Sequence, residues 1–211
     1  MKNIYVFDMD GTLIDSMGHF AEGMVKILRE DKIDYPDDIV NIITPLGTIK
    51  TIELFSQMGV RGTYEEIGKR MADNMLYLYS EVIKLKPFVK EYITKLKAEG
   101  KKLYVLTASP HLTVDICLKN NGVYDMFSEV WSSDDFAPLT KNMPDIHNAL
   151  AERVGCSVDD IVFFDDNILA LENAKKAGVY TVGVFDEHYP VPKEEVKAMA
   201  DEYIMSFEER L

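Results

Sequence analysis

Cysteine is scarce in this sequence of 211 residues, and long apolar runs are missing. The two cysteines, Cys117 and Cys156, have neither the spacing of a metal site nor the density of a disulfide-stabilised secreted domain. No segment approaches about 18 uninterrupted apolar residues, and no early stretch joins basic residues to a long apolar run. We therefore expect a cytoplasmic protein that is neither secreted nor membrane-spanning.

Basic side chains are also in the minority. Lys and Arg number 23 against 36 Asp and Glu, which gives a formal net charge of −13. Binding to nucleic acid or to an anionic membrane needs a basic face, so we expect neither partner. The sequence has no Gly-x-x-x-x-Gly-Lys loop, which argues against phosphoryl transfer from a nucleotide. Its length allows one ample core, or one core with a modest inserted domain.

Short apolar runs rich in β-branched residues recur along the chain. They predict strands at Ile4–Phe7, Leu103–Thr107, Glu129–Trp131, Ile161–Phe164 and Tyr180–Phe185. Helical patterns with start and stop signals lie between most of them, from Pro87 to Gly100, Ser109-Pro110 to Gly122, Pro144 to Gly155, and Leu169 to Gly178. This alternation predicts an α/β fold, a doubly wound parallel sheet with helices on both faces. We expect the acidic segment Lys193–Leu211 to form a surface helix.

Residues 17–84 follow a different pattern, without a convincing strand. Apolar side chains share one helix face at Phe20, Met24, Ile27 and Leu28, and another at Ile67, Met71, Met75, Leu78 and Val82. Methionines and aromatics at this spacing are far more often core residues than part of a cofactor site. We predict a helical domain at 17–84, inserted into an α/β core domain of 1–16 and 85–211, with hinges at Ser16–Gly18 and Leu85–Pro87.

An apolar strand at the start of the chain runs into two carboxylates, Asp8 and Asp10. Strand side chains alternate between faces, but the backbone turns where the strand ends, so both carboxylates can point into one crevice. Gly11 permits the turn and leaves room for a ligand. An ordinary hairpin with an Asp-Gly turn would look similar, but no alternating strand follows within reach and Asp8 precedes the turn.

Polar residues also follow the other predicted strands, and ligands of a doubly wound sheet bind at these ends. They are Thr107-Ala108-Ser109, Lys141 and Asp165-Asp166-Asn167. The first three precede the N-terminus of a predicted helix, which favours binding of an anion. Four carboxylates in one crevice need a cation, and Mg²⁺ prefers such oxygen ligands. A fixed positive charge and a hydroxyl donor complete a set that suits phosphoryl transfer.

Each of these residues also has an ordinary alternative role. Thr107 could cap the end of its strand, and Lys141 could be a solvated surface lysine. Asp165 and Asp166 could cap the helix that follows them. The functional interpretation depends on their order, because each lies at the end of a successive predicted strand.

The chain resembles the haloacid dehalogenase-like superfamily of hydrolases, in particular members with a helical cap after the first strand. Phosphoglycolate phosphatases and β-phosphoglucomutase belong to that group. The resemblance covers essentially the whole chain and rests on four motifs: Phe-Asp-Met-Asp-Gly-Thr-Leu-Ile-Asp-Ser, Leu-Thr-Ala-Ser, Lys141 with Pro144-Asp145-Ile146, and Val-Phe-Phe-Asp-Asp-Asn.

The resemblance implies a role for each motif residue. Asp8 would be the nucleophile, and Asp10 the general acid and then the base. The phosphoryl group would be bound by Thr107, Ala108 and Lys141. The implied metal is Mg²⁺, with Asp8, the Asp10 carbonyl, Asp166 and Asp165 as ligands. Asp165 stands where the family often has glycine, and it would act directly or through water.

The implied activity is a phosphatase that hydrolyses a small phosphorylated metabolite through an aspartyl-phosphate. A phosphomutase of the β-phosphoglucomutase type shares this chemistry, and His19 lies one residue short of where such an enzyme has a histidine. A surface role for His19 remains open. Dehalogenase activity is disfavoured by Asp10. A non-catalytic phosphate-binding module would be expected to have lost Asp8, Asp10 or Lys141, and none is missing.

Cap residues and assembly are less specified by the sequence. Gly47, Thr48, Lys50 and Arg61 lie in or near polar stretches that we expect to be loops, where they could face the substrate. Solvated side chains are the alternative for each of them. We expect a monomer or a weak dimer.

Overall fold

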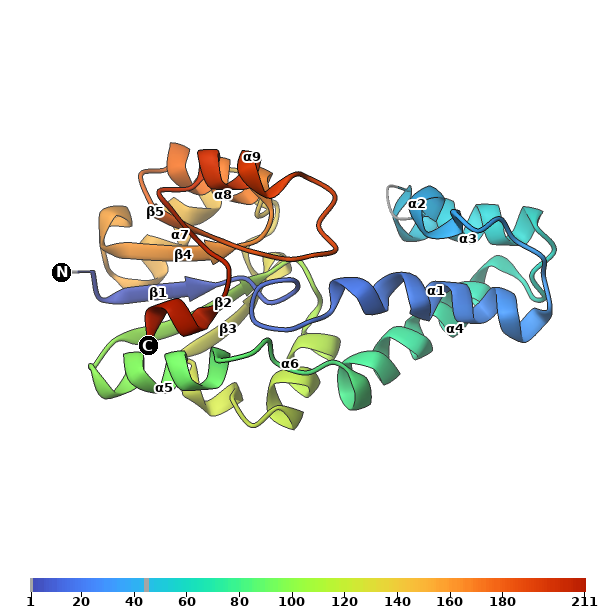
Figure 1. Ribbon diagram of the computed structural model, residues 1–211, viewed down its shortest axis with the longest axis horizontal. Helices are drawn as coiled ribbons and strands as arrows, with labels where there is room; N and C mark the ends of the chain where they lie inside the picture. The colour runs from blue at the N-terminus through green and yellow to red at the C-terminus, as the bar shows by residue number, and fades with distance from the viewer. Residues whose placement is uncertain (1, 44–45) are drawn as a thin grey trace. The chain divides into compact units, whose positions relative to one another are not determined.

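The computed structural model describes residues 2–43 and 46–211. The chain divides into two compact units, one made of Met1–Ser16 with Lys84–Leu211 and the other of Met17–Ile83. The larger unit contains a sheet, whereas the described residues of the smaller unit are helical (Figure 1).

A six-stranded sheet forms the centre of the larger unit, and each strand pair is parallel. The strands are β1 (Ile4–Phe7), β2 (Lys102–Thr107), β3 (Glu129–Ser132), β4 (Ile161–Asp165), β5 (Tyr180–Val184) and β6 (Glu202–Ile204). Their order in the sheet is β3-β2-β1-β4-β5-β6. The predicted α/β doubly wound sheet is confirmed. Because β2 and β4 flank β1, the ends of these three strands lie side by side.

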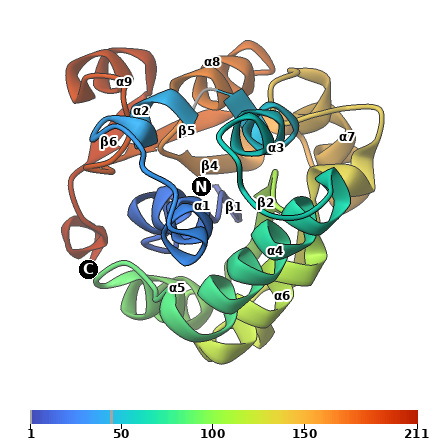
Figure 2. The same ribbon diagram turned by 90° about the vertical axis from the view of Figure 1, so that its right-hand side faces the viewer.

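Helices cover both faces of the sheet in the two ribbon views (Figures 1 and 2). One face carries α5 (Val89–Ala98) and α6 (His111–Asn120), and the other carries α7 (Asp145–Val154), α8 (Ile168–Lys176) and α9 (Lys193–Met199). Successive side chains of β1 point to opposite faces of the sheet, and so toward different helices. Ile4 and Val6 join a buried core with Ile146 of α7. Phe7 stacks on Phe164 at 4.7 Å between ring centroids, and meets Tyr92 of α5 edge-on.

The C-terminal segment differs from the predicted surface helix over Lys193–Leu211. Helix α9 ends at Met199, β6 then joins the sheet, and a 3-10 helix spans Phe207–Arg210. The Asp201 carboxylate accepts hydrogen bonds from the N–H and the hydroxyl of Thr181, each at 2.9 Å. These hydrogen bonds hold the extended backbone with which β6 pairs with β5. They join distant segments, so they cannot be predicted from the helical periodicity of the sequence.

The smaller unit has its own apolar core. Its helices are α1 (Met17–Asp31), α2 (Ile39–Ile43), α3 (Gly47–Gln57), α4 (Tyr64–Tyr77) and a π-helix at Leu78–Val82. Ile27, Phe55 and Met71 are buried together, as the helical spacing of methionines and aromatics predicts. Helix α4 begins with a capping box, in which Thr63 and Glu66 satisfy each other's backbone N–H groups.

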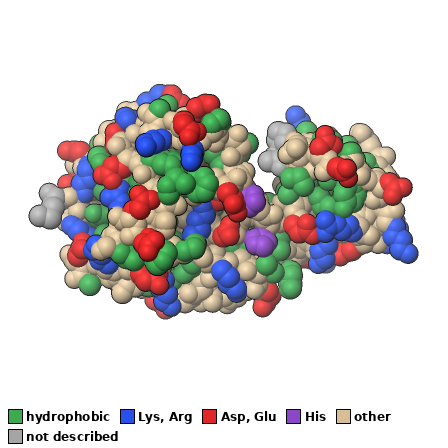
Figure 3. Space-filling view, in the orientation of Figure 1, with side chains coloured by type: hydrophobic (Ala, Val, Ile, Leu, Met, Phe, Trp, Pro, Cys, Tyr) green, Lys and Arg blue, Asp and Glu red, His purple; other side chains and the backbone are tan. Residues whose placement is uncertain are grey.

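The sequence predicts that three polar residues of this unit, Thr48, Lys50 and Arg61, lie in or near loops. Thr48 and Lys50 lie in the first turns of α3 rather than in a loop, and both are exposed. Arg61 does lie in a loop, but its Nη2 binds the Asp31 carboxylate at 2.8 Å, and Arg70 binds the same carboxylate at 3.0 Å. The exposed face in Figure 3 shows Lys and Arg interspersed with Asp and Glu over the described residues.

Candidate active site

Three buried carboxylates meet at the carboxyl edge of the sheet. Asp8 follows β1, Asp165 is the last residue of β4, and Asp166 comes next. Each offers an oxygen that lies within 4.8 Å of the others' oxygens. Hard oxygen donors at such spacing suit a divalent cation, because an unpaired cluster of buried carboxylates is strongly disfavoured.

Lys141 is buried against two of these carboxylates. Its ammonium forms an ion pair with Asp8 Oδ1 and lies 2.9 Å from Asp165 Oδ2. Lys141 is only 9% exposed, so the alternative of a solvated surface lysine is wrong. Burial favours the neutral amine, but the charges of Asp165 and Asp8 outweigh burial and raise the pKa of Lys141. Lys141 therefore stays cationic and fixes both carboxylates.

Desolvation dominates the electrostatics of the carboxylates. Burial raises the pKa of Asp8 well above its ordinary value, although the charge of Lys141 lowers it. Burial, together with the charge of Asp165, raises the pKa of Asp166 to about 7. The hydroxyl of Thr12 donates a hydrogen bond to Asp166 Oδ1 at 3.3 Å. Because its pKa is about 7, the Asp166 carboxyl group can exchange a proton for a metal ion near neutral pH.

The side chain of Asp10 is held by Ser109, a residue after β2 to which the sequence assigned no catalytic or binding role. Ser109 Oγ donates a hydrogen bond to Asp10 Oδ2 at 2.6 Å. Helix α6 has Pro110 as its N-cap, one residue later than the sequence suggested, so Ser109 stays in the loop before the helix. The hydroxyl of Thr107 accepts the Ser109 N–H at 3.1 Å, which is the capping role considered for it. Ala108 is exposed between them.

The helix after β4 does not use the aspartates as its cap. Asn167 is the N-cap of α8, and its side-chain oxygen accepts hydrogen bonds from the N–H groups of Leu169 and Ala170. Asp165 instead accepts the N–H of Asn167 at 2.8 Å through Oδ1, which leaves Oδ2 facing Lys141. The helix-capping alternative for Asp165 and Asp166 is therefore wrong.

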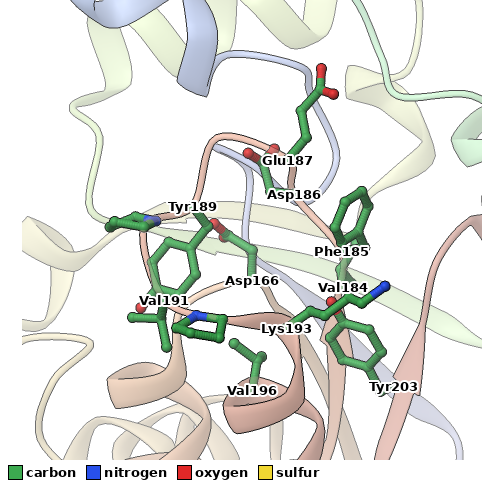
Figure 4. Close-up of a pocket in the computed structure, with 12 residues that line it drawn as sticks. Asp166, Val184, Phe185, Asp186, Glu187, Tyr189, Val191, Lys193, Val196 and Tyr203 are labelled. Atoms are coloured by element: carbon green, nitrogen blue, oxygen red, sulfur yellow. The ribbon is translucent and has the colours of Figure 1, made fainter. Parts of the chain in front are cut away.

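A pocket of about 250 Å³ adjoins Asp166 on the β5 side (Figure 4). Asp186, Tyr189, Lys193 and Tyr203 are among its lining residues. Lys86 binds Asp186 in an ion pair of 2.8 Å between buried side chains. This pair could not be predicted from the sequence, because Lys86 and Asp186 are 100 positions apart and belong to no motif.

Comparison with known proteins decides the family. Residues 5–184 match the family model of haloacid dehalogenase-like hydrolases. The chain belongs to this family. A phosphoglycolate phosphatase from Psychrobacter arcticus is 31% identical to this hydrolase over 179 residues, covering 76% of the chain and 78% of the relative. A phosphorylated carbohydrates phosphatase from Thermotoga maritima is 24% identical over 175 residues, covering 82% of the chain and 81% of the relative.

Solved structures show the same fold. The hydrolase superposes with a TM-score of 0.85 on a Thermotoga maritima structure assigned as a β-phosphoglucomutase, at 23% identity and with 96% and 94% of the two chains covered. It superposes with a TM-score of 0.76 on CbbY from Rhodobacter sphaeroides in complex with phosphate, at 20% identity, with 98% and 95% covered. The helices α1 to α4, which lie between β1 and β2, are thus the helical cap of this fold. No helix in the described ranges is long and apolar enough to span a bilayer.

Gly11 of the hydrolase cannot carry a side chain without displacing Asp166. Its φ is +74°, and a Cβ there would lie 2.5 Å from Asp166 Oδ2. We expect Gly11→Ala to lose most of the hydrolase activity and to lower the free energy of unfolding by about 1–2 kcal/mol through the left-handed backbone alone. Gly155→Ala is the matched control, because Gly155 also has φ +74° with no atom within 4 Å of its Cβ. Equal activity losses in both variants would contradict the close-approach argument.

The raised carboxylate pKa values predict how stability depends on pH. A folded-state pKa above the unfolded value stabilises the protein at low pH, and this stabilisation is lost as pH rises through the folded pKa, about 7 for Asp166. We expect the metal-free hydrolase to melt at a lower temperature at pH 8 than at pH 5.5, and Mg²⁺ to restore the difference at pH 8. Asp166→Asn should flatten this dependence in calorimetric scans. A metal-free melting temperature that rises from pH 5.5 to pH 8 would contradict it.

Proposed function

We propose that this hydrolase is a Mg²⁺-dependent phosphatase that hydrolyses a small phosphorylated metabolite through an aspartyl-phosphate on Asp8. One observation carries the proposal: a buried lysine fixes Asp8 beside Asp165 and Asp166 while Ser109 holds Asp10 at the same edge of the sheet. In the proposed mechanism these residues would supply a nucleophile, an acid/base group, a cation and a metal-ligand set.

Asp8 would attack phosphorus, forming an O–P bond as the bond to the leaving alcohol breaks. Asp10 would donate a proton to that leaving oxygen, then accept a proton from the water that hydrolyses the aspartyl-phosphate. Lys141, Thr107 and the N–H of Ala108 would bind the phosphoryl oxygens. Mg²⁺, held by Asp8, Asp10, Asp166 and Asp165, would supply positive charge to the same oxygens.

The donor set supports a divalent cation at this position. Lys141 forms ion pairs with two of the three buried carboxylates, Asp8 and Asp165, so the acidic groups of this cluster outnumber the lysine that pairs with them. Oxygen-only ligands favour Mg²⁺ over softer metals. The relatives named as phosphatases of phosphoglycolate and of phosphorylated carbohydrates support a small phosphorylated metabolite as the substrate class.

A screen for phosphate release over phosphorylated metabolites tests the proposal. We expect turnover of at least one compound with Mg²⁺, and loss of that turnover in EDTA with recovery on adding Mg²⁺. The screen includes β-glucose 1-phosphate, assayed also for the 6-phosphate, because formation of that product would identify a phosphomutase instead. Metal-independent turnover, or binding of phosphate without turnover of any compound, would contradict the phosphatase.

A further inference from the structure

His111 is the first residue of α6, two positions after the serine that binds Asp10. Both of its ring nitrogens face carboxylates: Nδ1 lies 3.2 Å from Asp115 Oδ1, and Nε2 lies 2.8 Å from Asp135 Oδ2. A neutral imidazole has a single N–H and can donate only one of these hydrogen bonds. The arrangement therefore fits a protonated ring that donates to both carboxylates.

Asp135 connects His111 to the chain that follows β3. It lies in a 3-10 helix at Ser133–Phe136, and its Oδ2 also accepts the N–H of Ser132 at 2.9 Å. The neighbouring Ser133 donates its hydroxyl to the carbonyl of Thr107 at 3.2 Å. Through these hydrogen bonds, His111 is connected both to the loop after β2 and to the segment that continues from β3 to Lys141.

We propose that His111 is a positioning residue for the phosphoryl-binding loop Thr107–Ser109, acting as a cationic clamp between Asp115 and Asp135. The inference rests on the proposed function, because it concerns how that site is held. The clamp orients Ser109 toward Asp10 and sets the direction of the Ala108 N–H, while His111 itself does not contact the reacting atoms. Neither the motif residues nor their spacing assigns this role to His111.

The charges around His111 decide when the clamp is closed. The groups on the elements that face it are Asp115 and Lys119 of α6, Tyr124, Glu129 of β3, Asp135 and Arg153 of α7. Hydrogen bonds to Asp135 and Asp115 raise the pKa of His111 above its ordinary value. A raised folded pKa means that the clamp is closed at low pH and opens as pH rises through that value.

Binding of inorganic phosphate in the presence of Mg²⁺ tests the clamp without requiring turnover. Dissociation constants are measured by calorimetry from pH 6 to pH 9 for wild type, His111→Gln and His111→Arg. His188→Gln is the matched control, because His188 is an exposed histidine beside Glu187 that does not itself line the pocket next to Asp166. Each variant is compared with wild type at the same pH, so that the titration of phosphate and of the carboxylates cancels.

We expect His111→Gln to weaken phosphate binding about fivefold at pH 6, at the low end of usual coupling because the ring is partly exposed, and to match wild type at pH 9. His111→Arg is permanently charged, so it should bind like wild type at pH 6 and more tightly than wild type at pH 9. A ratio that does not vary with pH in either variant would overturn the clamp and leave the phosphatase proposal standing. Wild type that binds no phosphate would overturn both proposals.

Discussion

Asp8→Asn is expected to abolish phosphate release, with a loss in kcat of at least about ten-thousandfold, as removal of a nucleophile usually causes. Asparagine has nearly the shape of aspartate but cannot attack phosphorus or balance the charge of Lys141. The fold should survive, because removing one of three buried carboxylates also removes repulsion. The two measurements are the turnover of the substrate found in the phosphate screen and the melting temperature of the Asp8→Asn protein.

The same chemical change elsewhere in the first motif provides the control. Asp15 is exposed, so Asp15→Asn should leave turnover within about twofold of wild type, as for ordinary surface substitutions. Phosphate labelled in the substrate should appear on wild-type protein after an acid quench and be absent from Asp8→Asn. An Asp8→Asn protein that retains turnover would show that the attacking group is another residue or water.

The positions of Asp8, Asp165 and Asp166 could be predicted from the sequence because each lies at the end of a strand, whereas Lys141 lies in the loop between β3 and α7. Strand order in a parallel sheet brings such ends together whatever the loops do, so a local pattern suffices. The buried ion pairs of Lys141 then follow from the need of buried carboxylates for a cation.

Ser109 also follows a predicted strand, but the hydrogen-bonding roles of Ser109 and His111 could not be predicted in the same way. Both act through hydrogen bonds to residues far away in the sequence, Asp10 and Asp135, and such bonds leave no periodicity. The strand β6 was missed for a related reason. Three residues are too few to show alternation, and the bonds of Thr181 to Asp201 that hold it lie between distant segments.

Lys141→Met should be the most destabilising of these substitutions. Methionine keeps the apolar stem but removes the charge, which leaves Asp8 and Asp165 buried without their cation. Breaking a buried ion pair costs about 3–5 kcal/mol, and loss of the charge proposed to bind the phosphoryl group should lower kcat about a thousandfold. The free energy of unfolding in urea with EDTA and phosphate release with Mg²⁺ are the measurements. Lys176→Met is the control, since Lys176 forms an exposed pair with Glu172 and should change stability by less than about 1 kcal/mol.

The pH dependence of Lys141→Met separates lost charge from lost packing. Lys141 lowers the pKa values of Asp8 and Asp165, so its removal should raise both further above their unfolded values. Protonation at low pH then relieves the repulsion, and the stability deficit relative to wild type should shrink from pH 8 to pH 5. Lys141→Met with Asp165→Asn should recover part of the deficit at pH 8, because one buried charge is gone. A deficit that is constant with pH would mean that the lysine acts through packing, and that Asp8 is not held by its charge.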